Sequence, residues 1–323
     1  MRAYNTAGGL AHFRAVVRVV VLSDIHSNLH ALEAVLDEVR SLSPDLVLNL
    51  GDTVGYNAHP REAWRKIRSV AHLTLLGNHD WAALADRADP AAEGAMSTSG
   101  PSASSGVVEP LASAIQVLQE TPDGALARFN PQARAAVEHT RRSLEPEDLR
   151  AIAALRPSGL LERDGVRFEA FHASPFDPLW DYVLPDRAAA TLESHLAHAD
   201  PGKGRHRFIL LGHTHVPVVT APVAVHHPSA LGSRPGRVIP GSGEVPNGGA
   251  SQATTSPGVA RLVNPGSVGQ PRDGDPRAAF ALIDLARDVV EIRRVAYDVD
   301  AAAAAVRATG LPRALADRLH FGR

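Results

Sequence analysis

Cysteine is absent from this chain of 323 residues. Its absence excludes disulfide bridges, thiolate metal sites and cysteine nucleophiles together. Lysine is scarce as well, since Lys66 and Lys203 are the only two and arginine supplies nearly all of the positive charge. The formal net charge is −2 at pH 7. We therefore expect no duplex DNA partner, because such a partner calls for a clear excess of basic residues.

The chain also lacks a long hydrophobic run. The longest early run, residues 15–22, contains Arg18 and is far too short to cross a membrane. No small-residue cleavage site follows it, which disfavours a secretory signal. We therefore expect a cytoplasmic protein with no membrane contact, built as a single domain over residues 16–323 behind an unstructured tail over residues 1–15.

Hydrophobic residues make up 44% of the chain, enough for a packed core. Apolar runs over residues 16–22, 46–50 and 70–76 are typical of buried strands. Between them the spacing of leucines after Asn28 predicts a capped helix, and Pro60 stands where a second helix would begin. This alternation of strands and helices predicts a mostly parallel sheet with covering helices.

The later part of the chain combines predicted helices and strands with two stretches of low complexity. Helices are expected to begin at Pro131 and Pro146, and Asp300 is expected to cap a last, alanine-rich helix. Further strands are expected over residues 166–171, 208–211, 278–285 and 289–295. Residues 89–106 and 228–258 are rich in Gly, Ser and Pro, and they are predicted to be flexible insertions within the one domain.

Polar side chains that bind metals or protons gather in short blocks at the predicted strand ends or in loops. The blocks are Asp24-Ile25-His26, Gly51-Asp52, Gly77-Asn78-His79-Asp80, His172 and Gly212-His213-Thr214-His215. In open α/β sheets, ligands bind outside the carboxyl ends of the strands. Distant segments of the chain are therefore expected to converge in one crevice. In the last block, alternate positions of an extended segment would place both histidines on one face.

These blocks offer oxygen and nitrogen donors only. Leaving His79 aside, two carboxylates, one amide and four imidazoles make more donors than a single ion needs. Such a set suits Mn²⁺, Fe, Co²⁺, Ni²⁺ or Zn²⁺. Two ions that share one carboxylate would use the whole set, keep a net positive charge and favour in-line displacement at phosphorus. Each block alone is common in ordinary loops, so the inference depends on their joint occurrence and order.

In this order the blocks resemble the calcineurin-like metallophosphoesterase superfamily, and more narrowly its small bacterial phosphodiesterase branch. Three further stretches carry the resemblance, residues 51–56, 172–175 and 264–272. It extends from residue 16 to the C-terminus, apart from the two insertions. Ala173 departs from the branch, which has glycine there, and a positive φ at this position would strain it.

The resemblance implies an α/β fold: a four-layer αββα sandwich of two mixed sheets flanked by helices. It also implies seven ligands for two divalent ions, Mn²⁺ in the first place and Fe, Ni, Co or Zn as alternatives. They are Asp24, His26 and His215 for one ion, Asn78, His172 and His213 for the other, and Asp52 as the bridge. His79 would protonate the leaving oxygen or stabilise the transition state, and Asp80 would orient His79.

By the same resemblance the chain is a phosphoesterase that hydrolyses a phosphodiester, or a phosphomonoester, by attack of a metal-bound hydroxide. Its substrate would be a small phosphoester such as a nucleotide, and Arg272 is the first candidate for a contact with the phosphate, followed by Arg277. Tyr56 is a candidate for the pocket edge. Two alternatives stay open: a metal-binding protein-interaction scaffold on the same fold, and a nuclease acting on short oligonucleotides. The sequence leaves the natural substrate and the oligomeric state undecided.

Overall fold

The computed structural model describes residues 18–85, 108–109, 121–198, 206–221, 251–254 and 260–323. The expected tail over residues 1–15, the stretch 89–106 and most of 228–258 lie outside the described residues. None of the described residues forms a helix long and apolar enough to cross a membrane.

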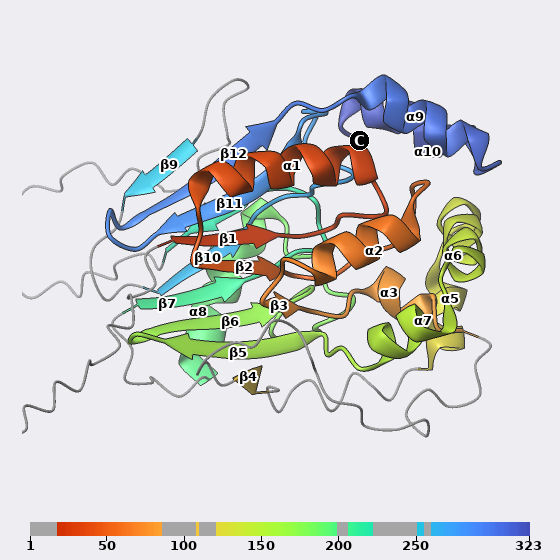
Figure 1. The fold of residues 1–323 in the computed structure, drawn as a ribbon. Coiled ribbons are helices and arrows are strands. Elements are labelled where there is room, and N and C mark those ends of the chain that lie inside the picture. The colour runs from red at the N-terminus through yellow and green to blue at the C-terminus, as the bar shows by residue number, and fades with distance from the viewer. Residues whose placement is uncertain (1–17, 86–107, 110–120, 199–205, 222–250, 255–259) are drawn as a thin grey trace, which may run out of the picture.

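Twelve described strands form two sheets that pack face to face (Figure 1). The first sheet has the order β3 (Leu73–Thr74), β2 (Leu46–Asn49), β1 (Arg18–Leu22), β11 (Ala278–Asp284), β12 (Val289–Val295) and β9 (Ser251–Thr254). The second sheet has the order β4 (Val108–Glu109), β5 (Ser158–Arg163), β6 (Val166–Phe171), β7 (His206–Leu210), β10 (Ala260–Asn264) and β8 (Val218–Thr220).

Both sheets are mixed. In the first, β1, β2 and β3 run parallel, and β11 and β12 extend the sheet in antiparallel pairs. In the second, β6, β7 and β10 run parallel, with β5 and β8 antiparallel beside them. The parallel strands form one side of the first sheet and the centre of the second, so their carboxyl ends provide two neighbouring rows of loops.

Helices cover the outer faces of the two sheets and one end of the sandwich (Figure 1). They are α1 (Leu29–Leu42), α2 (Pro60–Arg68), α3 (Asn78–Ala82), α5 (Pro122–Arg128), α6 (Pro131–Ser143), α7 (Pro146–Ala153), α8 (Pro185–His198), α9 (Val299–Ala308), α10 (Arg313–Asp317) and the 3₁₀ turn η1 (Arg318–Phe321). The helices α1 and α2 pack on the first sheet and α8 on the second. This arrangement confirms the predicted four-layer αββα sandwich.

The alternation along β1 shows why the layers stack in this way. Val19 and Val21 point into the core between the sheets, where they meet Phe168 and Phe208 of the second sheet. Val20, from the other face of the same strand, packs under α1. Successive residues of a strand point to opposite faces, so a strand buried on both sides is apolar throughout.

Several elements differ from the sequence-based expectation. The strand expected over residues 70–76 pairs only at β3, and α5, β5 and α8 are additional elements. Residues 251–254, within the stretch expected to be flexible, form β9 at the sheet edge. The helix α9 is capped by Asp298, whose side chain accepts a hydrogen bond from the Ala301 N–H, so Asp300 as the cap is wrong. Asp300 instead pairs with His320.

One buried ion cluster on β6 supports a prediction about stability. Glu169 is 1% exposed and accepts hydrogen bonds from His195, Arg207 and Arg167. Burial raises the pKa of Glu169, but these donors outweigh it and hold the pKa at about 2 against an ordinary 4.5. A depressed carboxyl pKa stabilises the fold above the unfolded value, and the contribution disappears as the pH falls from 4.5 through about 2.

We therefore expect Glu169→Gln to lower the free energy of unfolding at pH 7 by roughly 3 kcal/mol. Urea unfolding at a series of pH values measures this. The difference from wild type should shrink below pH 4.5, where the wild-type carboxylate becomes protonated on unfolding. Glu193→Gln, at an exposed position of the same helix as His195, is the control. A loss of stability that does not change with pH would contradict this assignment.

Candidate metal centre

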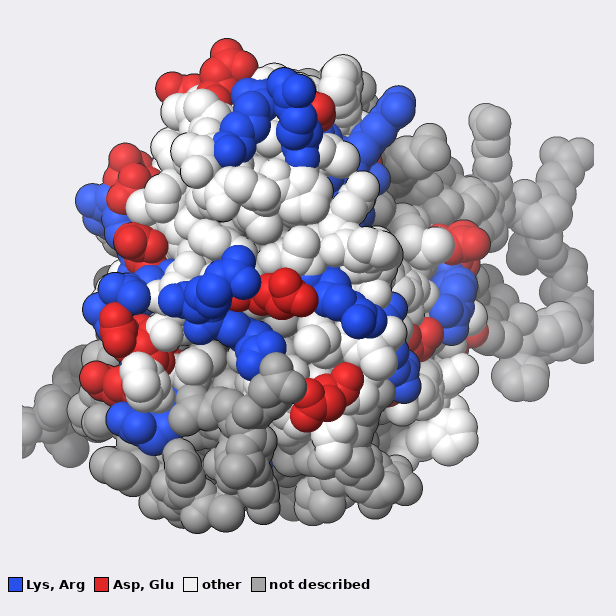
Figure 2. All heavy atoms as spheres, turned by 90° about the vertical axis from the view of Figure 1, so that its right-hand side faces the viewer, with Lys and Arg blue, Asp and Glu red and all other residues white. Residues whose placement is uncertain are grey.

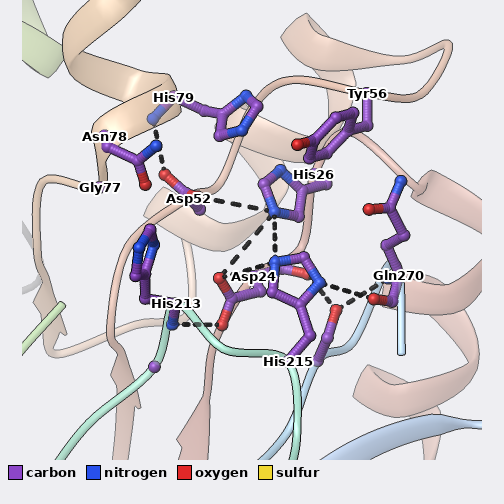
Figure 3. Close-up of polar contacts among 12 residues, drawn as sticks. Asp24, His26, Asp52, Tyr56, Gly77, Asn78, His79, His213, His215 and Gln270 are labelled. Carbon is purple, nitrogen blue, oxygen red and sulfur yellow. Dashed lines mark hydrogen bonds and ion pairs between the residues drawn. The ribbon is translucent and has the colours of Figure 1, made fainter. Parts of the chain in front are cut away.

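All seven predicted ligands follow the carboxyl ends of parallel strands in the two sheets. Asp24 and His26 follow β1, Asp52 follows β2, and Asn78 begins α3 just after β3. From the second sheet, His172 follows β6, while His213 and His215 follow β7. Each of the seven is 3% exposed or less. Figure 3 shows six of these side chains converging in one place, drawn from segments far apart in the sequence.

Asp24, His26 and His215 form the first group. The Nε2 atoms of His26 and His215 are 3.1 Å apart, and Asp24 Oδ1 lies 3.3 Å from His215 Nε2 (Figure 3). Asp24 Oδ1 is buried and has no hydrogen-bond partner. The other carboxylate oxygen, Oδ2, accepts the main-chain N–H of His213 at 3.0 Å, which holds the carboxylate in place.

Both imidazoles of this group have their tautomer set by main-chain carbonyls. His26 Nδ1 lies 3.1 Å from the Val54 oxygen, and His215 Nδ1 lies 2.6 Å from the Gln270 oxygen. A carbonyl only accepts, so each Nδ1 carries the hydrogen and each Nε2 keeps a free lone pair. Two lone pairs and a carboxylate oxygen therefore face one another with no hydrogen between them. A cation at this point satisfies all three.

The second group repeats this arrangement with Asp52, His172 and His213, whose ligand atoms lie within 4.8 Å of one another. His172 donates its Nδ1–H to the Leu50 carbonyl at 2.9 Å, and His213 donates to the carbonyl of Trp180. The His213 Nε2 is buried without a partner. His172 Nε2 is 3.1 Å from Asn78 Oδ1, so the predicted amide ligand joins this group.

Asp52 lies between the two groups. Its Oδ2 is 3.5 Å from His26 Nε2 and 3.6 Å from His172 Nε2, the position that a bridging carboxylate would take. Its Oδ1 accepts the main-chain N–H of His79 at 2.8 Å. A Cβ on Gly77 would be 2.0 Å from Asp52 Oδ1, so only glycine permits this approach.

The electrostatics of the site follow from burial. Burial lowers the pKa of His26, His213 and His215 well below the usual value, which keeps the rings neutral and their lone pairs available. Burial, partly offset by His172 and reinforced by Asp52, raises the pKa of Asp24 to about 7. Burial also raises the pKa of Asp52. Buried carboxylates and neutral imidazoles are the donor set that a divalent cation stabilises.

The backbone at the site is left-handed at five of these residues. The φ angles are 53° at Asp24, 47° at His26, 50° at Asp52, 65° at His213 and 61° at His215. Non-glycine residues rarely adopt this region, and they cluster at functional sites when they do. The expectation that His213 and His215 alternate along an extended segment is therefore wrong. Their rings enter different groups because the chain turns at both residues.

Side chains of the 264–272 stretch hold these turns. Asn264 Nδ2 donates to the Gly212 carbonyl at 2.8 Å and to Thr214 Oγ1 at 3.0 Å. Ser267 Oγ donates to the Asp24 carbonyl at 2.7 Å. Ala173, the departure from the family pattern, has no positive φ, so its methyl group causes no backbone strain.

His79 lies beside the first group, and one of its ring nitrogens forms a cluster with His26 and Asp52. Its ring contacts those of Tyr56, Phe129 and His26 at centroid distances of 4.3, 4.4 and 4.8 Å. Burial, with a smaller effect of Arg272, lowers the pKa of His79 well below its usual value, and Nδ1 has no hydrogen-bond partner. A neutral ring in this place can donate an N–H to an oxygen of a bound ester.

Asp80 has different partners from those expected. Its carboxylate accepts the main-chain N–H groups of Thr53 at 3.3 Å, Val54 at 3.0 Å and Gly77 at 3.0 Å. Among the described residues, the Asp80 carboxylate forms no hydrogen bond with the His79 ring. Asp80 therefore ties the loop that carries Asp52 to the loop that carries Asn78.

The two candidate arginines differ in their surroundings. Arg272 Nη2 lies 3.2 Å from Gln270 Oε1 and 3.5 Å from the Tyr56 hydroxyl, and its main-chain N–H donates to the His215 carbonyl. No Asp or Glu among the described residues pairs with Arg272. Arg277, in contrast, forms a two-pronged ion pair with Asp275, so its guanidinium is engaged away from the predicted ligands.

Sequence reasoning missed the groups that orient the imidazoles. These are the main-chain carbonyls of Leu50, Val54, Trp180 and Gln270. Every residue carries a carbonyl, so no residue type signals this role. For Asn264 and Ser267 the sequence did give a signal, because both residues lie in the stretch 264–272, which carries the family resemblance.

Comparisons with known proteins agree with this architecture. The model of the calcineurin-like phosphoesterase superfamily domain matches residues 17–288. A metallophosphoesterase from Sphaerobacter thermophilus has a similar structure, with a TM-score of 0.62 and 29% identity over 95% of this chain and 100% of that one. An uncharacterized protein from Methanocaldococcus jannaschii is 28% identical over 94% of this chain and 98% of its own length.

A hypothetical protein from Pyrococcus horikoshii shares the fold at a TM-score of 0.62. It is 18% identical, and the match covers 95% of this chain and 99% of that one. All three likenesses extend over nearly the whole chain.

Proposed function

This chain belongs to the calcineurin-like phosphoesterase superfamily, and from that premise we propose that it hydrolyses phosphate esters at a centre of two divalent metal ions. The observation that carries the proposal is the set of facing acceptor atoms. The Nε2 atoms of His26 and His215 lie 3.1 Å apart with the hydrogens on their opposite nitrogens. A cation between them would satisfy both lone pairs, and this supports the proposal.

The donor set fits two ions. Asp24, His26 and His215 would hold one ion, Asn78, His172 and His213 the other, and Asp52 both. Mn²⁺ is the first choice, since nitrogen and oxygen donors without thiolates suit it. The chemistry that the ions supply when bound is Lewis-acid activation of water and of the phosphoryl oxygens.

Three polar residues outside the set of seven ligands also have roles in the proposed reaction. Arg272 presents a guanidinium beside His215 with no carboxylate partner among the described residues, and a guanidinium fork matches two phosphoryl oxygens. His79 has a free ring nitrogen to donate to the ester or to its leaving oxygen. Asp80 positions the loop of Asp52 through three main-chain N–H groups.

Two other functions are less well supported. All seven donors are present and buried, and the tautomers of the four imidazoles are set for coordination, which a scaffold without catalysis does not require. A nuclease for long nucleic acid would need a basic surface. On the face shown in Figure 2, Lys and Arg side chains alternate with Asp and Glu, and ion pairs such as Arg65 with Asp148 neutralise them. Short oligonucleotides stay within the proposed class.

Hydrolysis of bis(p-nitrophenyl) phosphate and of p-nitrophenyl phosphate, measured side by side, tests the proposal. Protein stripped of metal and reloaded with Mn²⁺ should hydrolyse the diester faster, and the stripped protein should hydrolyse neither. A preference for the monoester would make the chain a phosphatase. Folded protein that hydrolyses neither ester with any divalent metal would refute the proposal and favour the scaffold.

A further inference from the structure

Exposed apolar side chains are concentrated in one segment of the chain, and this segment contacts the candidate metal centre. Among the described residues four large hydrophobic side chains are strongly exposed, and three of them fall within residues 176–184. They are Phe176 at 57%, Tyr182 at 47% and Leu184 at 43%. Single exposed apolar residues are ordinary, but a group of this kind marks an interaction site. We call residues 176–184 the apolar shelf.

The shelf is attached directly to the metal centre. It follows His172 by four residues, and its Trp180 carbonyl accepts the hydrogen bond that sets the tautomer of His213. The Tyr182 ring lies against the His213 ring, with 4.2 Å between the centroids. The half of Tyr182 that stays exposed therefore borders the space next to a ligand of the second group.

Its conformation is held by many contacts. Ser174 Oγ accepts the N–H groups of Phe176 and Asp177 at 3.2 and 3.0 Å, and Asp177 Oδ1 accepts those of Leu179 and Trp180 at 3.2 and 3.1 Å. These bonds form successive turns.

Packing anchors the shelf at its middle and near its C-terminal end. Leu179 is buried among the helices around α3, and Val183 is buried beneath α8. Arg187 donates to the Tyr182 carbonyl at 2.8 Å. The Tyr182 ring therefore belongs to an ordered segment. A ligand that binds against this ring costs less conformational entropy than one that must first order the segment.

We infer that the apolar shelf is a subsite for a flat aromatic group of the substrate, an aryl ring or a nucleobase, which stacks on Tyr182 while its phosphate lies at the metal centre. This inference rests on the proposed function and names the class of ester it serves. Stacking of a base on an aromatic side chain is sequence-tolerant and supplies enough free energy for about a tenfold gain in affinity. The substrate class is then an aromatic phosphoester, nucleotides included.

Calorimetric titrations of the Mn²⁺-loaded protein with methylphosphonate and phenylphosphonate test the inference, since both are stable to hydrolysis and carry the same head group. Wild type should bind phenylphosphonate about tenfold more tightly. Tyr182→Ala should lose that advantage and keep its affinity for methylphosphonate, whereas Tyr182→Phe should retain both. Phe321→Ala, which removes the fourth exposed hydrophobic side chain, is the matched control and should behave as wild type.

A titration with the phosphonate analogue of AMP, which resists hydrolysis, distinguishes the two kinds of aromatic group. Tighter binding of this analogue than of phenylphosphonate, lost in Tyr182→Ala, would identify a nucleobase, and equal binding would identify a simple aryl group. An unchanged preference for phenylphosphonate in Tyr182→Ala would overturn the inference, as would equal binding of both phosphonates by wild type. If neither phosphonate binds in a metal-dependent way, the proposed function is refuted. The inference about the shelf, which rests on that function, is then refuted as well.

Discussion

Replacing Asp52 with asparagine is expected to abolish metal binding and hydrolysis together. The Oδ2 atom of Asp52 lies 3.5 Å from His26 Nε2 and 3.6 Å from His172 Nε2, so one carboxylate serves both groups. An amide keeps the shape but removes the negative charge that offsets two cations. Loss of several kcal/mol of Lewis-acid stabilisation corresponds to a fall in kcat/KM of about a thousandfold or more.

Metal content by emission spectrometry, kcat/KM with bis(p-nitrophenyl) phosphate, and melting temperature with and without Mn²⁺ measure this effect. Wild type should melt at a higher temperature with Mn²⁺, because an ion that binds only the folded state stabilises it, and Asp52→Asn should show no such rise. Asp284→Asn is the control, since this carboxylate is also buried. It lies on β11 beside the first residue of β1, Arg18, with which it pairs, at the end of β1 away from Asp24. Full metal content in Asp52→Asn would contradict the bridging role.

Replacing His79 with alanine should slow turnover while leaving the metals in place. No main-chain carbonyl of the described residues holds the His79 Nδ1, which is buried without a hydrogen-bond partner. Its main-chain N–H, which holds Asp52 Oδ1 at 2.8 Å, survives the substitution. A group that donates a proton or a hydrogen bond in the transition state contributes about a hundredfold to kcat.

The diagnostic result is a split between turnover and metal content. We expect kcat to fall about a hundredfold in His79→Ala, with two metal ions still bound per chain and the Mn²⁺-dependent rise in melting temperature retained. His30→Ala removes another partly buried histidine, at the start of α1, and should leave all three quantities unchanged. Equal loss of metal in His79→Ala and Asp52→Asn would show that His79 is a ligand.

Much of the fold could be predicted because its signals are local. The apolar run before Asp24 forms β1 because both of its faces are buried, and Asn28 caps α1 through the Ala31 N–H, as its position predicts. Helices α6 and α7 begin at Pro131 and Pro146 for a similar reason, since proline fits the first turn of a helix. Weak local patterns were less reliable: the strand expected over residues 70–76 has only two residues at β3, and β9, which pairs with β12, was missed.

The sequence by itself determined the chemistry available at the site: oxygen and nitrogen donors, no thiolate, and a fixed order of blocks at strand ends. That order carries the family resemblance, and the resemblance implies the four-layer fold. Only the tertiary structure decided which atoms face one another. Carbonyls of Val54 and Gln270 orient His26 and His215, and Asp80 binds main-chain amides rather than the His79 ring.

The same holds for the two arginines, because the sequence could not show the surroundings of either guanidinium. Asp275 occupies Arg277, whereas Arg272 is left beside His215 without a carboxylate among the described residues. Such choices depend on contacts between segments distant in the chain. Main-chain groups carry no residue-specific signal, and a left-handed turn at His213 is sustained by Asn264, 51 positions later. Only packing of the two sheets brings these groups within reach of each other.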